Sequence, residues 1–541
     1  MEKQIELLDC TLRDGSYIND SHFGTPVIKG IIKKMQDARV DIIECGWLKD
    51  KGHEEGSAYY HVPSDLEPYL LNRTDNHTYV VMIDWDRYDV SNLPNCDGHS
   101  IDAIRVVFPH GKHREGIAVG KEIQKKGYKL YLQAANTMAY SDEDLKDLSV
   151  CINQVHPVAL SVVDTFGAML FEDLERIVKV LDKNLESEIK LGFHSHNNQQ
   201  LSFALSIYFI NLLKNSGRNI VVDASLCGMG RGAGNATTEL MVSYLNRKEH
   251  GNYDLDSVMD AIDLYITGLQ EKYSWGYSTP YFIAGLYQCH VNNIAYLLNN
   301  HRTNAKDMRN IISSLSQAER RKYDYDLLES KYMENQSRMI EDEAEKEKLH
   351  SEWKDRTVLL VAPGKSINDK EEKIKNFIAE NNPVVIGVNA INPRYEYDYV
   401  FFVNSARYDY AAATYKEQFE NTKHILLSNI KTTPGKNEIV FNFNRAIKRG
   451  WPHFDNAVIC CLRLLNQLNI SNIAIAGFDG FKTKYNESYA DESLPTLNPD
   501  NKWDELNEEI KDMFRDFVES TQGKMKIQFV TESYFEEKRR Q

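Results

Sequence analysis

The sequence has no long hydrophobic run and no cysteine pattern of a structural kind. None of its apolar stretches approaches the roughly 20 residues that a helix needs to span a bilayer, so we expect no membrane-spanning segment. The 8 cysteines occur without a C-x-x-C pair or zinc-finger spacing, and no apolar signal segment begins the chain. These absences predict a reduced, cytoplasmic protein.

The chain also has fewer basic than acidic residues. The chain has 64 Lys and Arg against 79 Asp and Glu, which gives a net charge of -15. This balance argues against a broad surface for nucleic acid or anionic membranes and favours a small-molecule partner. With 42% hydrophobic residues among 541, there is material for packed cores. The length predicts two to four domains of about 150 residues each.

Short β-rich runs alternate with amphipathic segments over the first 225 residues. In the segments, as in TPVIKGIIKKMQDA and EDLERIVKVLDK, apolar residues recur three and four apart, as on one face of a helix. The eight runs begin at Ile5, Val40, Thr78, Ala103, Lys129, Ala159, Ile189 and Asn219. Eight β-then-α units predict a closed parallel barrel, in which catalytic groups lie at the carboxyl ends of the strands.

The polar clusters of these units do follow the strands. They include Asp9, Thr11, Arg13, Asp14, Glu44, Asp84, Gln133, Asn136, Asp164, Thr165, His194 and His196, and after the eighth run the glycine-rich loop from Gly228 to Asn235. One rim of the barrel therefore collects the candidate chemistry.

His194 and His196 form the clearest candidate for metal binding. They are two residues apart, so at an extended strand end both side chains point to one side and can hold one ion. Asp14 would complete a two-histidine, one-carboxylate set for a divalent metal. An isolated H-x-H pair is more often a strand end without a ligand, but the neighbouring strand ends favour the metal. Arg13 then either stabilises an enolate oxygen or a substrate carboxylate, or closes the barrel mouth in a salt bridge.

Three motifs carry a resemblance to a known family. DCTLRDG, HSHNN and DASLCGMGRGAGN, in this order, resemble the metal-dependent aldolases, lyases and Claisen synthases built on a TIM barrel, and among them the 4-hydroxy-2-oxovalerate aldolases. VVDTFGAML and WGYSTPYFIAGLYQCHVNN extend the likeness over about residues 1–335. The resemblance implies Mn²⁺ or Mg²⁺ held by Asp14, His194 and His196, with Asn235 as a further ligand or a close neighbour.

The resemblance also implies a reaction. It is carbon–carbon cleavage or formation on a 2-keto acid, with an aldehyde as the other partner and with Arg13 stabilising a pyruvate-like enolate. Thr165 stands where the aldolases carry a small hydroxyl residue at the substrate. We assign Gln133 and Asn136, on the same rim, to substrate binding with it.

The sequence departs from these aldolases at the acid/base. They carry a histidine two residues after the glycine of the first motif, and here Tyr17 stands at that place. A tyrosine with an ordinary pKa near 10 is a poor base at neutral pH. Three alternatives stay open: Tyr17 donates a proton, a metal-bound water or Glu44 replaces the histidine, or the substrate differs.

Beyond the barrel the sequence predicts three further segments. Helical patterns at 281–335 predict an appendage that caps the barrel domain, 1–280, and the highly charged stretch 336–354 predicts a solvated connector. From 355 to 541, runs such as TVLLVAPGKS, PVVIGVN, DYVFFVN and NIAIAGFDGF again alternate with helical patterns. This predicts a doubly wound, Rossmann-like α/β domain.

Ligands of such a sheet bind beyond the carboxyl ends of its strands. The candidates there are Gly364, Ser366, Asn389, Asn404 and Asp479. APGKS lacks the spacing of a P-loop, so the turn after Ala362 either cradles a phosphate in another way or only reverses the chain.

The C-terminal segment is loosely similar to a Rossmann-like family that includes bacterial sialyltransferase-type glycosyltransferases. The likeness implies a nucleotide or nucleotide-sugar ligand and a role in surface polysaccharide biosynthesis. Two other functions stay open: a Claisen condensation of a keto acid with an acyl-CoA, and a non-catalytic barrel whose C-terminal domain carries the function. The helical appendage and the connector offer surfaces for a homo-oligomer.

Overall fold

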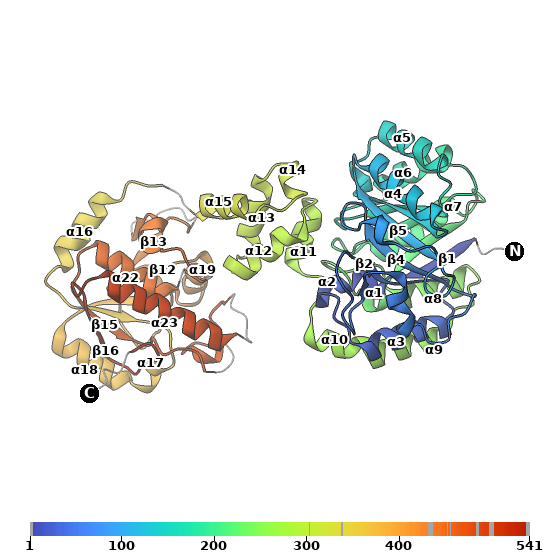
Figure 1. Ribbon diagram of the computed structural model, residues 1–541. Coiled ribbons are helices and arrows are strands. Elements are labelled where there is room, and N and C mark those ends of the chain that lie inside the picture. The colour runs from blue at the N-terminus through green and yellow to red at the C-terminus, as the bar shows by residue number, and fades with distance from the viewer. Residues whose placement is uncertain are drawn as a thin grey trace. The chain divides into compact units, whose positions relative to one another are not determined.

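The computed structural model divides into two compact units (Figure 1). Unit 1 is Met1–Ile294 with Ser316–Lys322, and unit 2 is Ala295–Leu315 with Tyr323–Gln541. The structure describes residues 4–301, 303–336, 339–430, 437–451, 453–454, 456–482, 486–496 and 502–536.

Unit 1 is the predicted TIM barrel. Eight parallel strands close on themselves because β1 pairs with both β2 and β9. The strands are β1 (Ile5–Asp9), β2 (Ile42–Leu48), β4 (Thr78–Asp84), β5 (Ala103–Pro109), β6 (Lys129–Ala135), β7 (Ala159–Asp164), β8 (Lys190–Ser195) and β9 (Ile220–Ala224). Each overlaps one of the predicted runs. A two-residue strand, β3 (Tyr59–Tyr60), extends the pairing of β2 outside the barrel.

Helices surround the barrel and bury one apolar face each. On α6, Leu174, Ile177 and Leu181 are buried at a spacing of three and four, as the sequence pattern predicts. The main outer helices are α3 (Thr25–Asp37), α4 (His113–Lys125), α5 (Asp142–Asn153), α6 (Phe171–Asn184), α7 (Ser202–Leu213), α8 (Thr238–Lys248) and α9 (Leu255–Ala261). Shorter helices are α1 (Thr11–Asp14), α2 (Ser16–Asn19), α10 (Thr267–Lys272), α11 (Thr279–Leu286) and α14 (Gln317–Arg320).

Unit 2 contains a second, open sheet of seven parallel strands in the order β14-β13-β12-β11-β10-β15-β16. The strands are β10 (Val358–Val361), β11 (Val384–Val388), β12 (Tyr399–Phe402), β13 (Lys423–Leu427), β14 (Glu438–Phe441), β15 (Asn472–Ala476) and β16 (Lys526–Phe529). Strand order reverses between β10 and β15, which is the switch point at which such sheets bind ligands. The edge strand β14 was not among the predicted strands.

Helices accompany this sheet along the chain. They are α13 (Ala305–Ser314), α15 (Tyr325–Gln336), α16 (Glu343–Trp353), α17 (Ser366–Asp369), α18 (Glu371–Asn381), α19 (Ser405–Thr414), α20 (Lys416–Asn421), α21 (Phe443–Ala446), α22 (Ala457–Gln467) and α23 (Trp503–Ser520). The division between the units falls within α12 (Val291–His301).

The two units divide the chain differently from the four predicted segments. Most of the predicted appendage belongs to unit 2, and the predicted connector contains α16, which is not fully solvated. Leu349 and Trp353 of α16 are buried, and the Trp353 ring lies 4.9 Å from that of Tyr399. These two apolar residues, four apart, give an otherwise charged helix one face that packs in unit 2.

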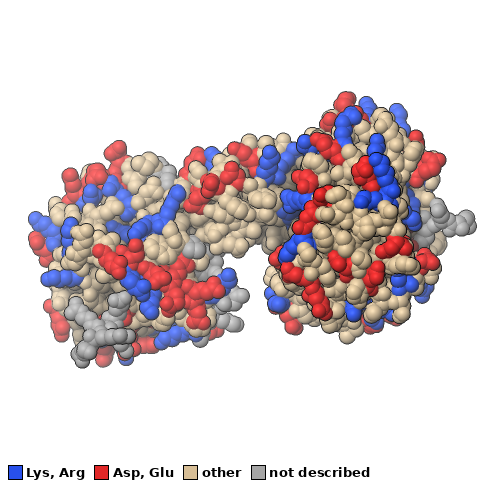
Figure 2. Space-filling view, in the orientation of Figure 1, with Lys and Arg blue, Asp and Glu red and all other residues tan. Residues whose placement is uncertain are grey.

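The surface agrees with the charge balance of the sequence. Figure 2 shows acidic and basic side chains interspersed over the visible face of each unit, with no extended basic area among the described residues there. Within the part of the chain that the structure describes, no helix has the length and apolar character needed to cross a membrane.

Candidate active site at the barrel mouth

Side chains inside the barrel form layers, and the polar chemistry begins where the apolar layer ends. Successive strand residues alternate in direction, so a residue two positions after an inward one also points inward. The apolar layer includes Leu8, Ile42, Val80, Ala103, Tyr131, Ala159 and Val221. Two positions beyond five of these stand Glu44, Arg105, Gln133, Ser161 and Asp223. A polar layer therefore lies directly above the packed floor of the barrel.

The three predicted metal ligands come together above this layer. Asp14 ends α1, the short helix after β1, while His194 lies on β8 and His196 directly follows that strand. All three are buried, and one potential ligand atom from each lies within 4.8 Å of the others. His196 Nδ1 is 3.9 Å from the Asp14 Oδ2 atom. The structure thus joins residues that are about 180 positions apart in the chain.

Unpaired atoms at this cluster fit a bound cation. Among the described residues, His196 Nδ1 and Asn235 Oδ1 are buried without a hydrogen-bond partner. Asn235 instead donates through Nδ2 to Asp14 Oδ2, at 2.6 Å. At Gly230, an added Cβ would lie 2.4 Å from Asp14 Oδ2, so only glycine lets this loop approach so closely. The donor set of oxygen and imidazole nitrogen suits a divalent metal with open positions.

The protonation states also suit a metal. Burial raises the pKa of Asp14, but the charge of Arg13, together with His196, His194 and the Asn235 amide, holds that pKa well below its usual range. Burial lowers the pKa of His196 to about 4, despite the opposing charge of Asp14. At neutral pH the carboxylate is therefore ionised and this imidazole is neutral, as metal coordination requires.

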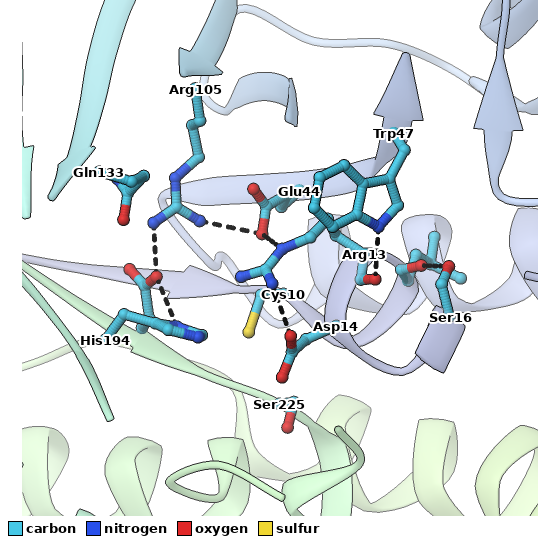
Figure 3. Close-up of polar contacts among 12 residues, drawn as sticks. Cys10, Arg13, Asp14, Ser16, Glu44, Trp47, Arg105, Gln133, His194 and Ser225 are labelled. Carbon is cyan, nitrogen blue, oxygen red and sulfur yellow. Dashed lines mark hydrogen bonds and ion pairs between the residues drawn. The ribbon is translucent and has the colours of Figure 1, made fainter. Parts of the chain in front are cut away.

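Arg13 is held in place by two carboxylates (Figure 3). Its Nη1 donates to Asp14 Oδ1 at 2.6 Å and its Nε donates to Glu44 Oε2 at 2.8 Å. Trp47 Nε1 donates to the Arg13 carbonyl at 3.0 Å, and the guanidinium lies 5.7 Å from the Trp47 ring. These contacts fix a positive charge next to the candidate metal ligands.

Two further residues, Arg105 and Asp223, continue this network. Arg105 Nη1 lies 2.9 Å from Glu44 Oε2, and its Nη2 lies 2.5 Å from Asp223 Oδ2. The same Asp223 oxygen is 3.0 Å from His194 Nδ1. This contact turns the other ring nitrogen of His194 toward the ligand cluster, a common arrangement around metal-binding histidines.

Sequence reasoning did not single out Arg105 or Asp223. The available signal was a charged residue inside an apolar strand, AIRVVF for Arg105 and NIVVDA for Asp223. A buried charge needs a partner of opposite sign, so the charged residue in each strand predicts an ion pair. Which residues would pair was not readable from either strand alone.

Tyr17 lies at the rim and not in the buried layer. Its side chain is 50% exposed, and its ring lies 6.0 Å from that of Trp47. The Arg231 guanidinium is 5.1 Å from the Tyr17 ring and also contacts His290, with Nη2 2.7 Å from Nε2. Desolvation by the surrounding protein raises the pKa of Tyr17 despite the Arg231 charge. Its hydroxyl is therefore protonated at neutral pH.

The predicted substrate residues occupy two levels. Gln133 is buried in the polar layer and donates through Nε2 to Ser161 Oγ at 2.8 Å. Asn136, whose φ is 53°, and Thr165 lie nearer the surface, where the Asn136 N–H donates to Thr165 Oγ1 at 2.6 Å. The structure thus brings Asn136 and Thr165 together and places Gln133 deeper.

Comparisons with known proteins point to one family for this barrel. The HMGL-like family model matches residues 113–265. Over 282 residues the chain is 31% identical to a 4-hydroxy-2-oxovalerate aldolase from Shewanella halifaxensis, covering 50% of this chain and 79% of that protein. It is 27% identical to an oxaloacetate decarboxylase from Mycobacterium tuberculosis over 263 residues, or 47% of this chain and 74% of that one.

A solved structure is also similar. It is the N-terminal domain of a protein from Bacteroides vulgatus provisionally named an aldolase, with a TM-score of 0.46 and 25% identity. The match covers 54% of this chain and 95% of that one.

Proposed function

The chain belongs to the HMGL-like family of metal-dependent aldolases and lyases that act on keto acids, and from this premise we propose that its barrel is an aldolase. In the proposal it cleaves or forms a carbon–carbon bond of a 2-keto acid through a pyruvate-like enolate, with an aldehyde as the second partner. The observation that carries the proposal is the contact of Arg13 with Asp14 beside His194 and His196.

Asp14, His194 and His196, with Asn235 beside them, would hold Mn²⁺ or Mg²⁺. Such a cation supplies a Lewis acid for the oxygens of the keto acid. Arg13 supplies a fixed positive charge for the oxygen that becomes negative in the enolate, and it needs no rearrangement because Glu44 already orients it. Glu44 Oε2 is taken by Arg13 and Arg105, so we assign Glu44 to positioning Arg13.

Tyr17 is our candidate for the proton donor. In the cleavage direction, the C4 hydroxyl of a 4-hydroxy-2-keto acid loses its proton to solvent and becomes the carbonyl of the aldehyde, while the bond between C3 and C4 breaks and its electron pair enters the enolate. The Tyr17 hydroxyl, which is protonated at neutral pH, then gives its proton to C3 and pyruvate results. The half-exposed Tyr17 oxygen regains a proton from solvent, so the reaction releases one pyruvate and one aldehyde without a net change in protons. Asn136 and Thr165, which are hydrogen-bonded at the rim, would contact the hydroxy-alkyl end of the substrate.

Several finer points belong to the same proposal. Unit 2 would bind a nucleotide or nucleotide-sugar, the whole chain would serve surface polysaccharide biosynthesis in the cytoplasm, and the chain would form a homo-oligomer. The second candidate reaction of the barrel is a Claisen condensation with an acyl-CoA, which would release free CoA in place of an aldehyde.

The test is pyruvate release from a panel of 4-hydroxy-2-keto acids with Mn²⁺ or Mg²⁺, followed with a coupled dehydrogenase. We expect metal-dependent release that is lost in His194→Ala. The matched control is His77→Ala, because His77 precedes β4, its Nδ1 lies 2.7 Å from the Val40 carbonyl, and it belongs to neither group of described residues that could hold a metal ion. If protein that is shown to bind metal releases no pyruvate from any member of the panel, a simple pyruvate aldolase is excluded. The next assay would then be release of CoA from acyl-CoA.

A further inference from the structure

Unit 2 has a cavity at the carboxyl edge of its sheet. Its volume is about 220 Å³, and it lies at the switch point, where the loops after β10 and β15 meet. Of the five residues predicted to bind a ligand in this domain, Gly364, Asn389, Asn404 and Asp479 line it. Residues of α13 and α15, including Asp307 and Tyr332, form another wall.

The turn after β10 does not provide the anion site that its glycine suggested. The Gly364 N–H donates to the Gly477 carbonyl at 3.0 Å, and the Ser366 N–H donates to Asp479 Oδ2 at 2.8 Å. Ser366 Oγ donates to the other Asp479 oxygen at 2.5 Å. A Cβ on Gly364 would lie 2.4 Å from the Gly477 oxygen, so the glycine is needed for the crossing of two loops. These donors already have partners.

Arg407 is the cation that this cavity leaves unsatisfied. It is 5% exposed, lines the cavity, and its Nη1 has no hydrogen-bond partner among the described residues. Its guanidinium lies 4.8 Å from the Tyr489 ring. Burial raises the pKa of the nearby Asp491 carboxyl, but its hydrogen bonds and the charge of Arg407 lower it below the usual range. Asp491 Oδ2 accepts from the hydroxyls of Tyr410 and Tyr415 at 2.9 and 2.8 Å, and among the described residues no hydrogen bond or ion pair joins Asp491 to Arg407. A buried guanidinium with a free donor is costly unless an anion completes it.

The start of α19 points to the same ligand chemistry. Arg407 is the third residue of this ten-residue helix, and Ser405 and Ala406 before it also line the cavity. The first N–H groups of a helix lack intrahelical partners and carry partial positive charge, which favours an anion. Asn404 caps the helix by accepting from the Arg407 N–H at 3.0 Å. The N-terminal end of α19 and the Arg407 guanidinium therefore both favour an anion at the same place in the cavity.

Asn429 supplies a neutral polar group in the same cavity. Its Nδ2 donates to the Val403 carbonyl at 2.8 Å, while its Oδ1 is buried without a partner among the described residues. Because the nitrogen is fixed in this way, the oxygen is presented to the cavity as an acceptor. A hydroxyl or an amine of a ligand would satisfy it.

We propose that this cavity binds a phosphate ester of a single sugar or nucleoside. The phosphate contacts Arg407 and the first turn of α19, Asn429 Oδ1 accepts from a ligand hydroxyl, and Tyr489 flanks the group beside the guanidinium. The volume of about 220 Å³ is below the roughly 300–1,000 Å³ of drug-sized ligand pockets, which favours a single sugar or nucleoside over a dinucleotide.

Calorimetric titration of the full chain tests this site. The probes are nucleoside monophosphates, sugar 1-phosphates, the matching unphosphorylated nucleosides and sugars, and inorganic phosphate. We expect a phosphate ester to bind and its unphosphorylated counterpart to bind at least about tenfold more weakly, as one charge-assisted contact implies. Nucleoside monophosphates and sugar phosphates are titrated separately, and the class that binds identifies the class of the ligand.

Substitutions in the full chain test whether the phosphate binds at Arg407 and the start of α19. We expect Arg407→Gln to weaken the phosphate ester about tenfold or more, while Arg463→Gln, which removes another buried arginine of unit 2 outside this cavity, leaves affinity unchanged. Ser405→Asp is the second variant, because an acid in the first turn suits the helix yet repels the phosphate. Equal affinity in wild type and Ser405→Asp would overturn the proposal, as would no binding by any probe at millimolar concentration.

Discussion

The two sites of this molecule handle buried charge in opposite ways. At the barrel mouth, Arg13 and Arg105 are each held between two carboxylates before any substrate arrives. In the cavity of unit 2, Arg407 is buried and forms no ion pair with any of the residues that the structure describes. Chemistry on a developing negative charge needs a dipole that is already oriented, whereas a binding site gains affinity from a charge that only the ligand completes. Charge pairing thus separates the arrangement that we propose for catalysis from the one that we propose for binding.

The largest effect is expected at Arg13. Arg13→Lys keeps the charge but cannot reach Asp14 and Glu44 at once, as the fork of the guanidinium does. We expect kcat for pyruvate release to fall about 10²–10³-fold with metal still bound. Kinetics together with metal analysis measure this. Unchanged kcat would mean that the preorganised network is not part of the chemistry.

Asp223 tests whether the network also positions a metal ligand. In Asp223→Asn the His194 ring loses its charged partner and Arg105 keeps only Glu44. We expect metal affinity to weaken about 10–100-fold. Titration of the metal-free protein with Mn²⁺ measures it. Phosphate-ester binding in unit 2 serves as the internal control, since it should not change.

Asp9 is a buried acid of the barrel, and it has no cation partner among the described residues. Burial raises its pKa to about 6, although Thr238 Oγ1 and the Thr11 N–H donate to it. Between about pH 4 and pH 6 the unfolded chain has released this proton and the folded chain has not, so stability falls as pH rises through that window. The loss reaches about 1.4 kcal/mol per pH unit.

Urea unfolding of the barrel transition in wild type and Asp9→Asn measures this effect. The variant cannot titrate, so the wild type should lose about 2 kcal/mol relative to it between pH 4 and pH 6. A difference that does not depend on pH would show that Asp9 is paired in a way that the structure does not contain.

The smallest effect is expected at Lys365, beside the turn after β10. Its ammonium pairs with Glu492 at 2.9 Å, and both side chains are about half exposed. Lys365→Ala should change the affinity for the phosphate ester less than about threefold, because exposed pairs contribute little. A loss of affinity as large as that expected for Arg407→Gln would indicate that the phosphate binds at the turn after β10.

Much of the barrel was readable because its signals are local. The eight runs, the helical periodicity between them and the polar residues at the strand ends predict the rim, and Asp14, His194 and His196 lie there within ligand distance. The prediction of open parallel strands after residue 355 is confirmed as well. It missed β14, a run of only four residues at the edge of the sheet.

Other features depend on pairs that no local pattern encodes. Helix α16 reads as a charged connector, but two apolar residues suffice to bury one of its faces. At the turn after Ala362 the glycine was visible in the sequence, but its role in a loop crossing became clear only when Gly477 was placed opposite.

By itself the sequence determined where strands and helices form and which polar residues reach the barrel rim, because backbone periodicity and side-chain alternation act over a few residues. Only the tertiary structure decided that Arg105 bridges Glu44 and Asp223, and that Arg407 Nη1 has no partner in the part of the chain that the structure describes. A charge needs a partner within a few ångströms, and the fold alone sets which distant residues come that close.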